Sequence, residues 1–455
     1  MSEQNIEICI LAAGMGKRMH STIPKAMQRL AGKPILAHLL QSAQALNPSQ
    51  IHVVIGPEGN SIKSAFPEMT VNWVTQIDRR GTGHAVLQAL PHFDSDSRVL
   101  ILVGDAPLLS TKTMASLAAV EAPLSVLTAT MEDPGGYGRI VKSESGLISE
   151  IVEHRDATDL QKQICEINTG VMASSAAHLH DWLPQLDDDN DQGELLLTDI
   201  VVLANQAELE VKAFLSKDLL EVTGINSFSQ LAALESALQR RRAETLLASG
   251  VHIIDPDRFD LRGELECGTD VYIDINCVFE GKVSLGDGVR IGANCSIKDA
   301  VIAANSVIKE NSVLDDCQVG PESQVGPFAR LRPGTLLHSA VSIGNFVEVK
   351  NTEVGTGSKA SHLTYLGDSV IGSEVNIGAG TITCNYDGVL KHTTRIEDHV
   401  FVGSNTAFVA PVTIGARSTI AAGSTITKDV DEGELAISRG KQKSVTNWKR
   451  PEGDK

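Results

Sequence analysis

The stretch VGPESQVGPFARLRPGTLLHSAVSIGNFVEV, residues 319–349, repeats an aliphatic residue at every sixth position. Two other stretches, 285–303 and 396–426, keep the same period. The markers of the three runs are Val319, Val325, Leu331, Leu337, Ile343, Val349; Leu285, Ile291, Ile297, Ala303; and Ile396, Val402, Phe408, Ile414, Ile420, Ile426. A period of six suits neither a helix nor an alternating strand. It is typical of a coil in which three short strands each turn one aliphatic side chain inward, so we predict a parallel β-helix of about ten coils.

The frame of six slips by one residue twice, from Val349 to Val354 and from Leu366 to Ile371. Alternating strands of another β fold could give such spacing by accident, but two runs of six markers in strict register argue against it. The segment CNYDG interrupts the frame between Thr383 and Arg395, and we interpret it as a loop that projects from the coils. Loops inserted into a solenoid commonly carry binding residues.

Length and composition narrow the class of protein. The 455 residues, 42% of them apolar, favour two to four domains. The sequence begins MSEQNIEICI and has no apolar run near the ~20 residues of a membrane span, so we expect a soluble, cytoplasmic protein without membrane insertion. Seven scattered cysteines without a C-x-x-C pair predict reduced thiols and neither disulfides nor a zinc site. A formal charge of −18 argues against nucleic acid as a partner.

The N-terminal half predicts an α/β domain with a mostly parallel sheet. Expected strands at Glu7–Leu11, Ile51–Ile55 and Val99–Val103 alternate with expected helices at Ile35–Leu46 and Gly83–Leu90. The first strand runs into AAGMGKRM, residues 12–19, a glycine loop followed by cations that suits phosphates. The loop is neither a dinucleotide fingerprint nor a P-loop. Gly104 and Asp105 follow the third strand, at the sheet edge where ligands bind.

A long helix is predicted to connect the two halves. The segment FSQLAALESALQRRRAETLLASG, residues 228–250, places Phe228, Leu231, Leu234, Leu238 and Leu246 on one apolar face and ends at a glycine. We expect it to act as a rigid arm. The predicted domains are therefore residues 1–226, a linker helix at 227–250, and the β-helix at 251–455.

Short motifs in both halves resemble one known family. The first half contains ILAAGMGKRM, Pro24 with Lys25, QxxxxGTGHA, the GD pair, GYGRI, IVEH, EINTG and GINS, as in sugar-phosphate nucleotidyltransferases. The second contains RLRPG, GNFVEVK, SHLTYLGD, NIGAGTITCNYDG, FVGSN and AISR. Nearly the whole chain is similar, in the same order, to the bifunctional N-acetylglucosamine-1-phosphate uridyltransferases and glucosamine-1-phosphate N-acetyltransferases. The resemblance implies a nucleotidyltransferase domain and a left-handed β-helix.

The resemblance implies a uridyltransferase site in the first half, with UTP, N-acetylglucosamine 1-phosphate and Mg²⁺. Arg18 and Lys25 would neutralise phosphates, and Asp105 with Asn226 would hold the metal through oxygen ligands. The residues implied for the UDP-sugar are Leu11, Ala12, Ala13, Gly14, Lys25, Gln76, Gly81, Thr82, Val103, Gly104, Asp105, Gly138, Glu153, Asn168 and Asn226.

Two positions depart from the family pattern. The family's glycine loop usually has a lysine before its second glycine and a threonine after it, whereas this chain has Met15 and Lys17 there. A cation has thus moved by two positions. Val103 stands before the Gly-Asp pair, where the family often has tyrosine.

The second half is expected to transfer an acetyl group from acetyl-CoA to glucosamine 1-phosphate. His362, in SHLTYLGD, matches the family's base, since neutral histidine can take a proton near pH 7. The resemblance implies Arg332, Lys350, Tyr365 and Asn376 for the acceptor sugar phosphate, and Ala379, Asn385, Tyr386, Ser404, Ala422 and Arg439 for acetyl-CoA. It also implies a homotrimer with its sites between subunits, and a product that feeds peptidoglycan and lipopolysaccharide synthesis.

Two other functions remain open at this point. The chain could be a nucleotidyltransferase whose β-helix only assembles it, or an adenylyltransferase-like enzyme with a regulatory solenoid. A solitary aspartate after a strand is more often a turn residue, and the basic tail after Arg439 can equally be solvated. The set His362, Asn385 and Tyr386 weighs against both alternatives, because a purely structural helix needs no projecting loop beside a histidine.

Overall fold

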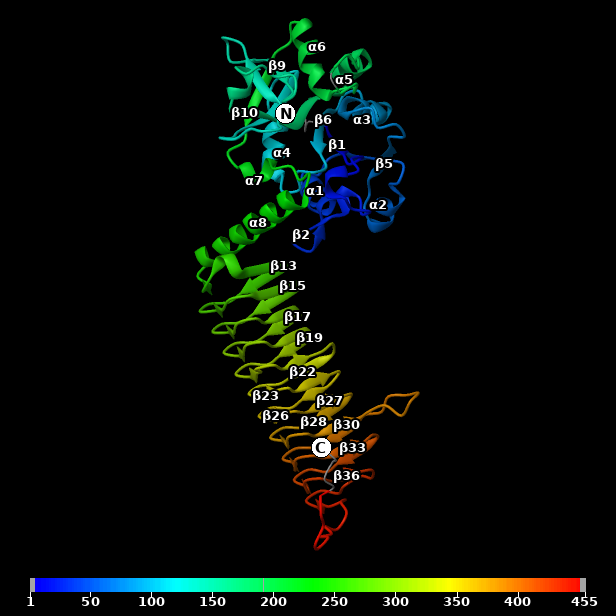
Figure 1. The fold of residues 1–455 in the computed structure, drawn as a ribbon, viewed down its shortest axis with the longest axis vertical. Helices are drawn as coiled ribbons and strands as arrows, with labels where there is room; N and C mark the ends of the chain where they lie inside the picture. The colour runs from blue at the N-terminus through cyan, green and yellow to red at the C-terminus, as the bar shows by residue number, and fades with distance from the viewer. Residues whose placement is uncertain (1–4, 191, 451–455) are drawn as a thin grey trace. The chain divides into compact units, whose positions relative to one another are not determined.

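The computed structural model describes residues 5–190 and 192–450, in two units, Met1–Leu238 and Gln239–Lys455. A nine-stranded sheet with the strand order β11-β7-β10-β6-β1-β4-β5 forms the centre of the first unit (Figure 1). These strands are β1 (Ile6–Leu11), β4 (Gln50–Ile55), β5 (Asn72–Thr75), β6 (Arg98–Val103), β7 (Leu124–Thr130), β10 (Glu166–Ser175) and β11 (Val211–Leu215). Neighbours pair in parallel except at β10, which is antiparallel to β6 and β7. The antiparallel β8 (Arg139–Lys142) and β9 (Ile148–Val152) extend the sheet from β10.

Helices cover both faces of this sheet, which explains the unbroken apolar runs in its central strands. Ile8 and Ile10 of β1 pack with α1 (Ile35–Gln44) and α4 (Thr111–Ala118). Cys9, between them, faces the opposite side with α3 (Thr82–Ala89), α5 (Ala176–Trp182) and α6 (Ile200–Gln206). The first unit also contains two shorter helices, α2 (Asn60–Ala65) and α7 (Leu219–Val222). The predicted α/β class is confirmed.

The predicted long helix is α8 (Phe228–Ala248), 21 residues long. Leu234 and Leu238 are buried with Ile35 and Ile225 of the first unit. Phe228, the first residue of this helix, is 49% exposed.

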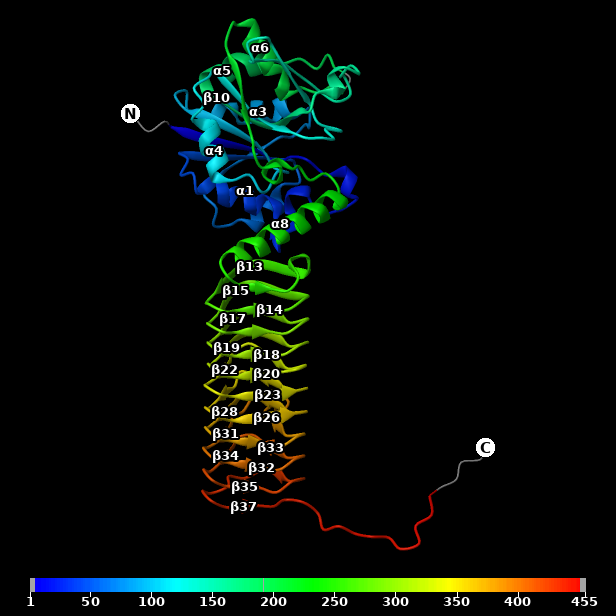
Figure 2. The same cartoon turned by 90° about the vertical axis from the view of Figure 1, so that its left-hand side faces the viewer.

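The second unit is a parallel β-helix, as predicted (Figure 2). One face is an 11-stranded sheet of short strands: β12 (His252–Ile253), β14 (Tyr272–Ile273), β16 (Arg290–Ile291), β18 (Val307–Ile308), β20 (Gln324–Val325), β23 (Ser342–Asn345), β26 (Lys359–His362), β29 (Asn376–Ile377), β32 (Phe401–Val402), β35 (Thr419–Ile420) and β37 (Leu435–Ala436). Each strand pairs in parallel with the next along the stack, so each coil contacts only its neighbours.

The other faces begin as continuous strands and then divide. The long strands are β13 (Phe259–Cys267), β15 (Cys277–Leu285), β17 (Ser296–Ile302) and β19 (Val313–Val319). After β19 the sheet splits into two columns. One holds β21 (Arg330–Leu331), β24 (Glu348–Lys350), β27 (Tyr365–Gly367), β30 (Ile382–Cys384), β33 (Ala407–Val409) and β36 (Thr425–Ile426); the other holds β22 (Thr335–Leu337), β25 (Glu353–Val354), β28 (Ser369–Ile371), β31 (Thr394–Ile396) and β34 (Val412–Ile414).

The inward residues follow the predicted markers with one correction. Ala303 was expected inside, but Ile302 fills that place and is fully buried, while Ala303 is half-buried. The reason is a five-residue step from Ile297 to Ile302, and a second one leads from Leu314 to Val319. The core of the coils is otherwise the aliphatic stack that the period predicts, and each fully buried aliphatic side chain contributes about 1.5–3 kcal/mol.

Corners with positive φ separate the faces of the coils. One column of corners consists of Asn276, Asn294, Asn311, Phe328, Phe346, Leu363, Gly380, Asn405 and Gly423. Glycine and asparagine tolerate this conformation, whereas a bulky side chain is an outlier there. Three successive coils therefore carry Phe328, Phe346 and Leu363 at a cost of roughly 1–2 kcal/mol each.

All seven cysteines are free thiols, and burial raises the pKa of Cys277 and Cys317 to about 12. Among the residues that the structure describes, no helix is long and apolar enough to cross a membrane.

Candidate active sites

A cavity of about 530 Å³ opens at the carboxyl ends of β1 and β6 in the first unit. A second cavity of about 240 Å³ adjoins it, and Leu11, Thr82, Val103 and Asp105 line both. The residues predicted for this site divide between the two cavities. The first is lined by Leu11, Ala12, Ala13, Gly14, Arg18, Lys25, Gln76, Gly81, Thr82, Val103, Gly104 and Asp105. The second adds the remaining ones, Gly138, Glu153, Asn168 and Asn226.

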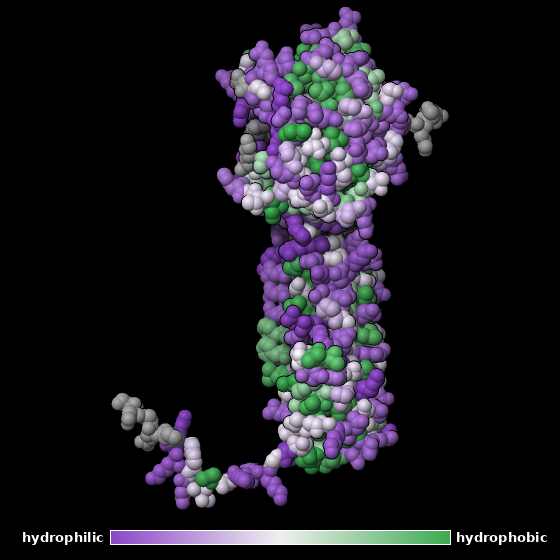
Figure 3. Space-filling model, turned by 90° about the vertical axis from the view of Figure 1, so that its right-hand side faces the viewer, coloured by the Kyte–Doolittle hydropathy of each residue, from purple (hydrophilic) through white to green (hydrophobic). Residues whose placement is uncertain are grey.

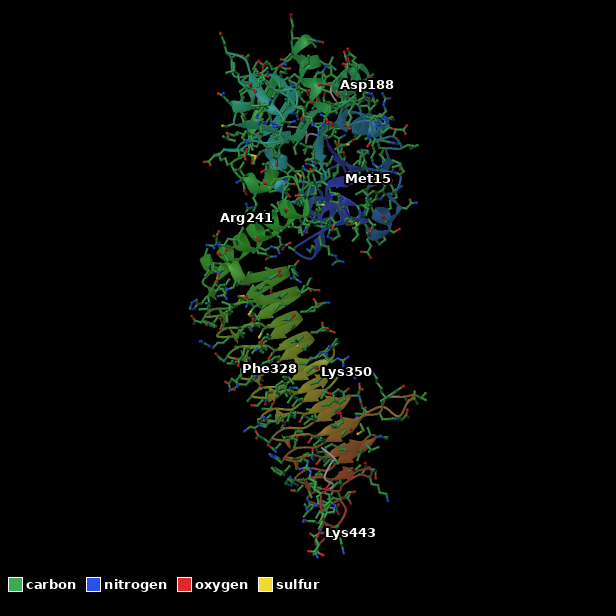
Figure 4. All side chains as sticks on the ribbon, in the orientation of Figure 1. Met15, Asp188, Arg241, Phe328, Lys350 and Lys443 are labelled. Atoms are coloured by element: carbon green, nitrogen blue, oxygen red, sulfur yellow. The ribbon has the colours of Figure 1, made fainter. Side chains whose placement is uncertain are left out.

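The glycine loop is tied to the edge of the sheet by backbone hydrogen bonds. Ala12 N–H donates to Val54 O at 2.8 Å, and Gly104 N–H donates to Leu11 O at 2.9 Å. A side chain at Gly104 would place its Cβ 2.7 Å from Leu11 O, so this close approach requires glycine. The loop side chain Met15, labelled in Figure 4, is half-exposed. The side chain of Lys17 lies outside the described residues.

Lys25 lies between the two predicted metal ligands. Its Nζ donates to Asp105 Oδ2 at 2.5 Å and to Asn226 Oδ1 at 2.8 Å. One ammonium thus neutralises the carboxylate, although Asn226 is 121 residues further along the chain. The two oxygens converge on a single cation, which makes the pair chemically suited to a hard metal ion as well.

Gln76 and Thr82 are held rigidly at the nucleotide end of the cavity. The Gln76 side chain is buried, and its Nε2 donates to Gly81 O at 3.1 Å. Gly81 has φ of +105°, and a Cβ there would collide with the Leu195 carbonyl. Thr82 Oγ1 accepts from Leu197 N–H at 3.1 Å. Arg18 is exposed at the rim.

The sugar cavity has an acidic wall. Burial raises the pKa of Glu153, and the nearby Asp156 and Asp199 raise it further. Asn168 Oδ1 accepts from Gly170 N–H at 2.9 Å, which fixes its side chain, and the backbone N–H of Asn168 donates to Gly138 O at 2.9 Å. Sequence reasoning missed Tyr137 and Thr198, which also line this cavity. The GYGRI motif contains Tyr137 and could have pointed to it.

In the second unit, His362 lies at the end of β26, exposed on the coil surface. Its Nδ1 and Asn345 Oδ1 are 2.8 Å apart. An amide oxygen only accepts hydrogen bonds, so this contact places the proton on Nδ1 and leaves Nε2 as an acceptor. The side chain borders a cavity of about 310 Å³ that is lined by Lys309, Gln324, Gly326, Pro327, Ser342, Ile343, Gly344, Asn345, Ser361 and His362.

The residues predicted for the acceptor phosphate gather on the next face. Arg332 pairs with Glu348 at 2.8 Å, and this hydrogen bond raises the pKa of Arg332. The projecting loop brings Lys391 beside Lys350, and that neighbouring cation lowers the pKa of Lys391. Sequence reasoning missed Lys391, because only the fold of the loop carries it back to Lys350. Two cations held together suit a phosphate dianion.

The loop between β30 and β31 projects from the coils, as predicted (Figure 1). His392 N–H donates to Asn385 O at 2.9 Å, which closes its base. Asn385 Nδ2 donates to Asp368, fastening the loop to the preceding coil. Tyr386 is 61% exposed. Its neighbours in the loop, Val389 and Leu390, are also largely exposed.

The residues predicted for acetyl-CoA form an edge along successive coils. Asn405 N–H, next to Ser404, donates to Ala379 O, and Gly423 N–H, next to Ala422, donates to Ser404 O. Arg439 Nη1 donates to Ala422 O at 2.7 Å, so the chain's last coil contributes to this edge.

The cavity beside His362 is not lined by Arg332, Lys350, Tyr365 or Asn376. Figure 4 shows Phe328, which belongs to the same corner column as Leu363, and Lys350 on opposite sides of the coil stack.

Three protein-family models match parts of this chain. A MobA-like NTP transferase domain model matches residues 8–169, a GMPPB C-terminal domain model matches 261–354, and a bacterial transferase hexapeptide model of six repeats matches 393–428. The protein is thus a transferase with an NTP transferase domain and a left-handed β-helix of hexapeptide repeats.

Curated relatives align along almost the whole chain. A bifunctional protein GlmU of Marinobacter nauticus is 51% identical over 98% of this chain and 99% of its own. One of Methylobacillus flagellatus is 52% identical over 98% of this chain and 97% of its own. A solved UDP-glucose pyrophosphorylase complexed with UDP-glucose aligns with 16% identity and a TM-score of 0.43 over 52% of this chain and 99% of that chain.

The chain belongs to the family of bifunctional GlmU proteins. It is a bifunctional enzyme of UDP-N-acetylglucosamine synthesis, with glucosamine-1-phosphate N-acetyltransferase and N-acetylglucosamine-1-phosphate uridyltransferase activities.

Proposed function

We propose that the two adjoining cavities of the first unit are the uridyltransferase site, with UTP in the larger and N-acetylglucosamine 1-phosphate in the smaller. The convergence of Lys25, Asp105 and Asn226 where the cavities meet carries this assignment. The reacting phosphates would lie there. Gln76, Gly81 and Thr82 would bind the uracil, and Glu153 and Asn168 would bind sugar hydroxyl or amide groups.

The reaction at this site is an in-line displacement. A phosphate oxygen of the sugar phosphate attacks the α-phosphorus of UTP, and pyrophosphate leaves. Both reactants are anions, so the chain contributes mainly alignment and positive charge. Backbone N–H groups of the glycine loop orient the triphosphate, and Arg18 and Lys25 neutralise its charge.

Asp105 and Asn226 would hold Mg²⁺, which lowers the charge repulsion between the reactants when it is bound. Their oxygens already share one cation, the Lys25 ammonium. Among the described residues no group of three His, Cys, Asp or Glu forms a metal cage. Two protein ligands suit Mg²⁺, which keeps several waters and binds substrate phosphates.

We propose that the β-helix acetylates glucosamine 1-phosphate. The amine nitrogen attacks the thioester carbonyl of acetyl-CoA, and His362 Nε2 takes a proton from the amine. The C–S bond then breaks, and the departing CoA thiolate receives that proton and leaves as the thiol. Asn345 orients the imidazole. Arg332, Lys350 and Lys391 would bind the sugar phosphate, with Tyr365 and Asn376 at the sugar. Ala379, Ser404, Ala422 and Arg439, with Asn385 and Tyr386 of the loop, would bind acetyl-CoA.

The function is tested by two assays on the purified protein. Thiol release from acetyl-CoA is expected with glucosamine 1-phosphate, and pyrophosphate release is expected with UTP and N-acetylglucosamine 1-phosphate. Absence of thiol release would favour a β-helix that only assembles the protein. A preference for ATP over UTP would favour the adenylyltransferase alternative.

We propose that the active form is a homotrimer. Phe328, Phe346 and Leu363 are 49%, 55% and 63% exposed, and the two phenylalanine rings stack at 5.3 Å. These bulky apolar side chains have a strained backbone conformation and are exposed to water. Both features favour a surface that another subunit covers. Leu363 follows His362 directly, so a second copy seated on this corner would lie beside the base. Figure 3 shows further bands of apolar side chains along the coil stack.

Replacing Phe328 and Phe346 by serine is expected to convert the trimer to monomers at micromolar concentration, because about 100 Å² or more of apolar surface per subunit loses its contact. Sedimentation velocity measures the change. The rate of acetylation should decrease as the trimer is lost, while the rate of uridylyl transfer stays the same. The control is Leu160→Ser, since Leu160 is 78% exposed in the first unit. A wild-type monomer in the same run would contradict the proposal.

Glu153 predicts a pH dependence. Its pKa is raised, so its carboxylate gains a proton at a higher pH than an ordinary glutamate and stops accepting hydrogen bonds from the sugar. The KM for N-acetylglucosamine 1-phosphate is expected to rise as the pH falls, and Glu153→Gln should remove that dependence. Ionisation of a group with a raised pKa opposes folding at neutral pH, so Glu153→Gln should also raise the Tm at pH 7. An unchanged pH profile in the variant would contradict the assignment.

The product, UDP-N-acetylglucosamine, serves peptidoglycan and lipopolysaccharide synthesis. We propose a cytoplasmic location, where free thiols such as the seven cysteines persist.

A further inference from the structure

A guanidinium group lies under the glycine loop, between the nucleotide cavity and a neighbouring cavity of about 330 Å³. It belongs to Arg79, in the segment QIDRRGTGHA between β5 and α3. Its Nε donates to Ala13 O at 2.7 Å, and an Nη donates to Glu58. The group packs over Gly56, where any Cβ would collide with it. The path of the chain therefore leaves a place for this guanidinium beside the loop.

Position 15 of the same loop carries a methionine, and the cations of the loop, Lys17 and Arg18, come only after Gly16. Met15 lines the nucleotide cavity at the position where the family pattern has lysine, and Arg79 lines that cavity too. A guanidinium offers several donors in a plane and retains its charge at any ordinary pH.

We propose that Arg79 supplies the triphosphate of UTP with the positive charge that Met15 does not provide. The inference rests on the proposed nucleotide site. The bond from Nε to Ala13 O holds the loop, while Nη2 contacts Glu58 in the neighbouring cavity, and the Arg79 side chain lines both cavities. Glu58 is the counter-ion in the free protein, and the hydrogen bond from Arg79 lowers its pKa. Because Glu58 is 58% exposed, this pair is weak and can give way to phosphate.

The test is UTP binding, measured by titration calorimetry with Mg²⁺ and without the sugar phosphate, alongside steady-state kinetics. Arg79→Gln is expected to weaken UTP binding and raise its KM by about 10- to 100-fold, the usual worth of charge-assisted hydrogen bonds to phosphate. The affinity should also depend less on salt concentration. The matched control is Arg80→Gln, because Arg80 is an exposed neighbour paired with Asp188 at 3.0 Å. It should change UTP affinity less than twofold.

A second substitution separates charge from loop support. Adding Met15→Lys to Arg79→Gln is expected to restore most of the UTP affinity, since it returns a cation to the loop. If Arg79 only supports the loop, Met15→Lys will restore nothing and the salt dependence will stay as in the wild type; that result overturns the proposal, as does unchanged affinity in Arg79→Gln. A wild-type protein that does not bind UTP would instead overturn the proposed function of the site.

Discussion

Asp105→Ala is expected to abolish UDP-sugar formation and to leave acetyl transfer unchanged. The substitution removes the only carboxylate proposed to hold the metal and leaves Lys25 with Asn226 as its remaining partner. Loss of several kcal/mol of charge stabilisation corresponds to a fall in kcat/KM of about a thousandfold or more. Pyrophosphate release measures the first activity and thiol release the second.

Asp188→Ala is the matched control for Asp105→Ala. Asp188 is an exposed carboxylate of the same unit, paired at the surface with Arg80. Its removal should change uridylyl transfer by less than about twofold, because exposed pairs contribute little. Asp105 and His362 belong to different units, so loss of both activities in a folded Asp105→Ala protein would contradict the assignment of two separate sites.

His362→Ala is expected to lower the kcat of acetylation by roughly 10²- to 10⁴-fold, with folding and uridylyl transfer intact, as for removal of a positioned general base. Raising the pH should partly restore the variant, because the free amine then needs no proton acceptor. Asn345→Ala should give a smaller loss, since Asn345 acts only by orienting the imidazole through its 2.8 Å contact. The measurement is kcat against pH for each variant.

His338→Ala provides the control in the same β-helix. His338 is also an exposed histidine, paired with Glu353 at 2.7 Å, and it has no proposed part in the reaction. Acetylation should be unaffected. If His362 were only a packing residue, His362→Ala would lower the Tm and loosen the assembly, and its kcat per folded protein would match that of His338→Ala.

Much of the fold was predictable because it follows from repeated local patterns. The six-residue period identified the β-helix, and the apolar strands that alternate with helices identified the α/β unit. Ala303 shows the limit: alanine fits a marker by type, but Ile302 beside it buries more apolar surface, so the real step is five residues. A shift of one residue in the period depends on which of two neighbouring side chains buries more apolar surface. A fixed period of six cannot predict that choice.

The residues of the first site were predictable as a set because each is attached to a short motif, and the structure brings all of them to two adjoining cavities. Arg79, Tyr137 and Lys391 were missed. Arg79 and Lys391 reach their positions only through tertiary structure, the first beneath a loop 66 residues away and the second through a projecting loop. The corner residues Phe328 and Phe346 were also not predicted, since positive φ at phenylalanine contradicts its local preference.

The coil lengths limit how this half of the chain can gain or lose residues. The pairs Val325–Ile343 and Ile343–Ala360 define coils of 18 and 17 residues, while Ile377–Val402, which spans the projecting loop, defines one of 25. Extra residues are thus accommodated at a corner without disturbing the ladders on either side. Deletion of a single residue inside a strand would turn inward side chains outward, whereas deletion of a complete coil between equivalent corners would leave every remaining side chain on its original face.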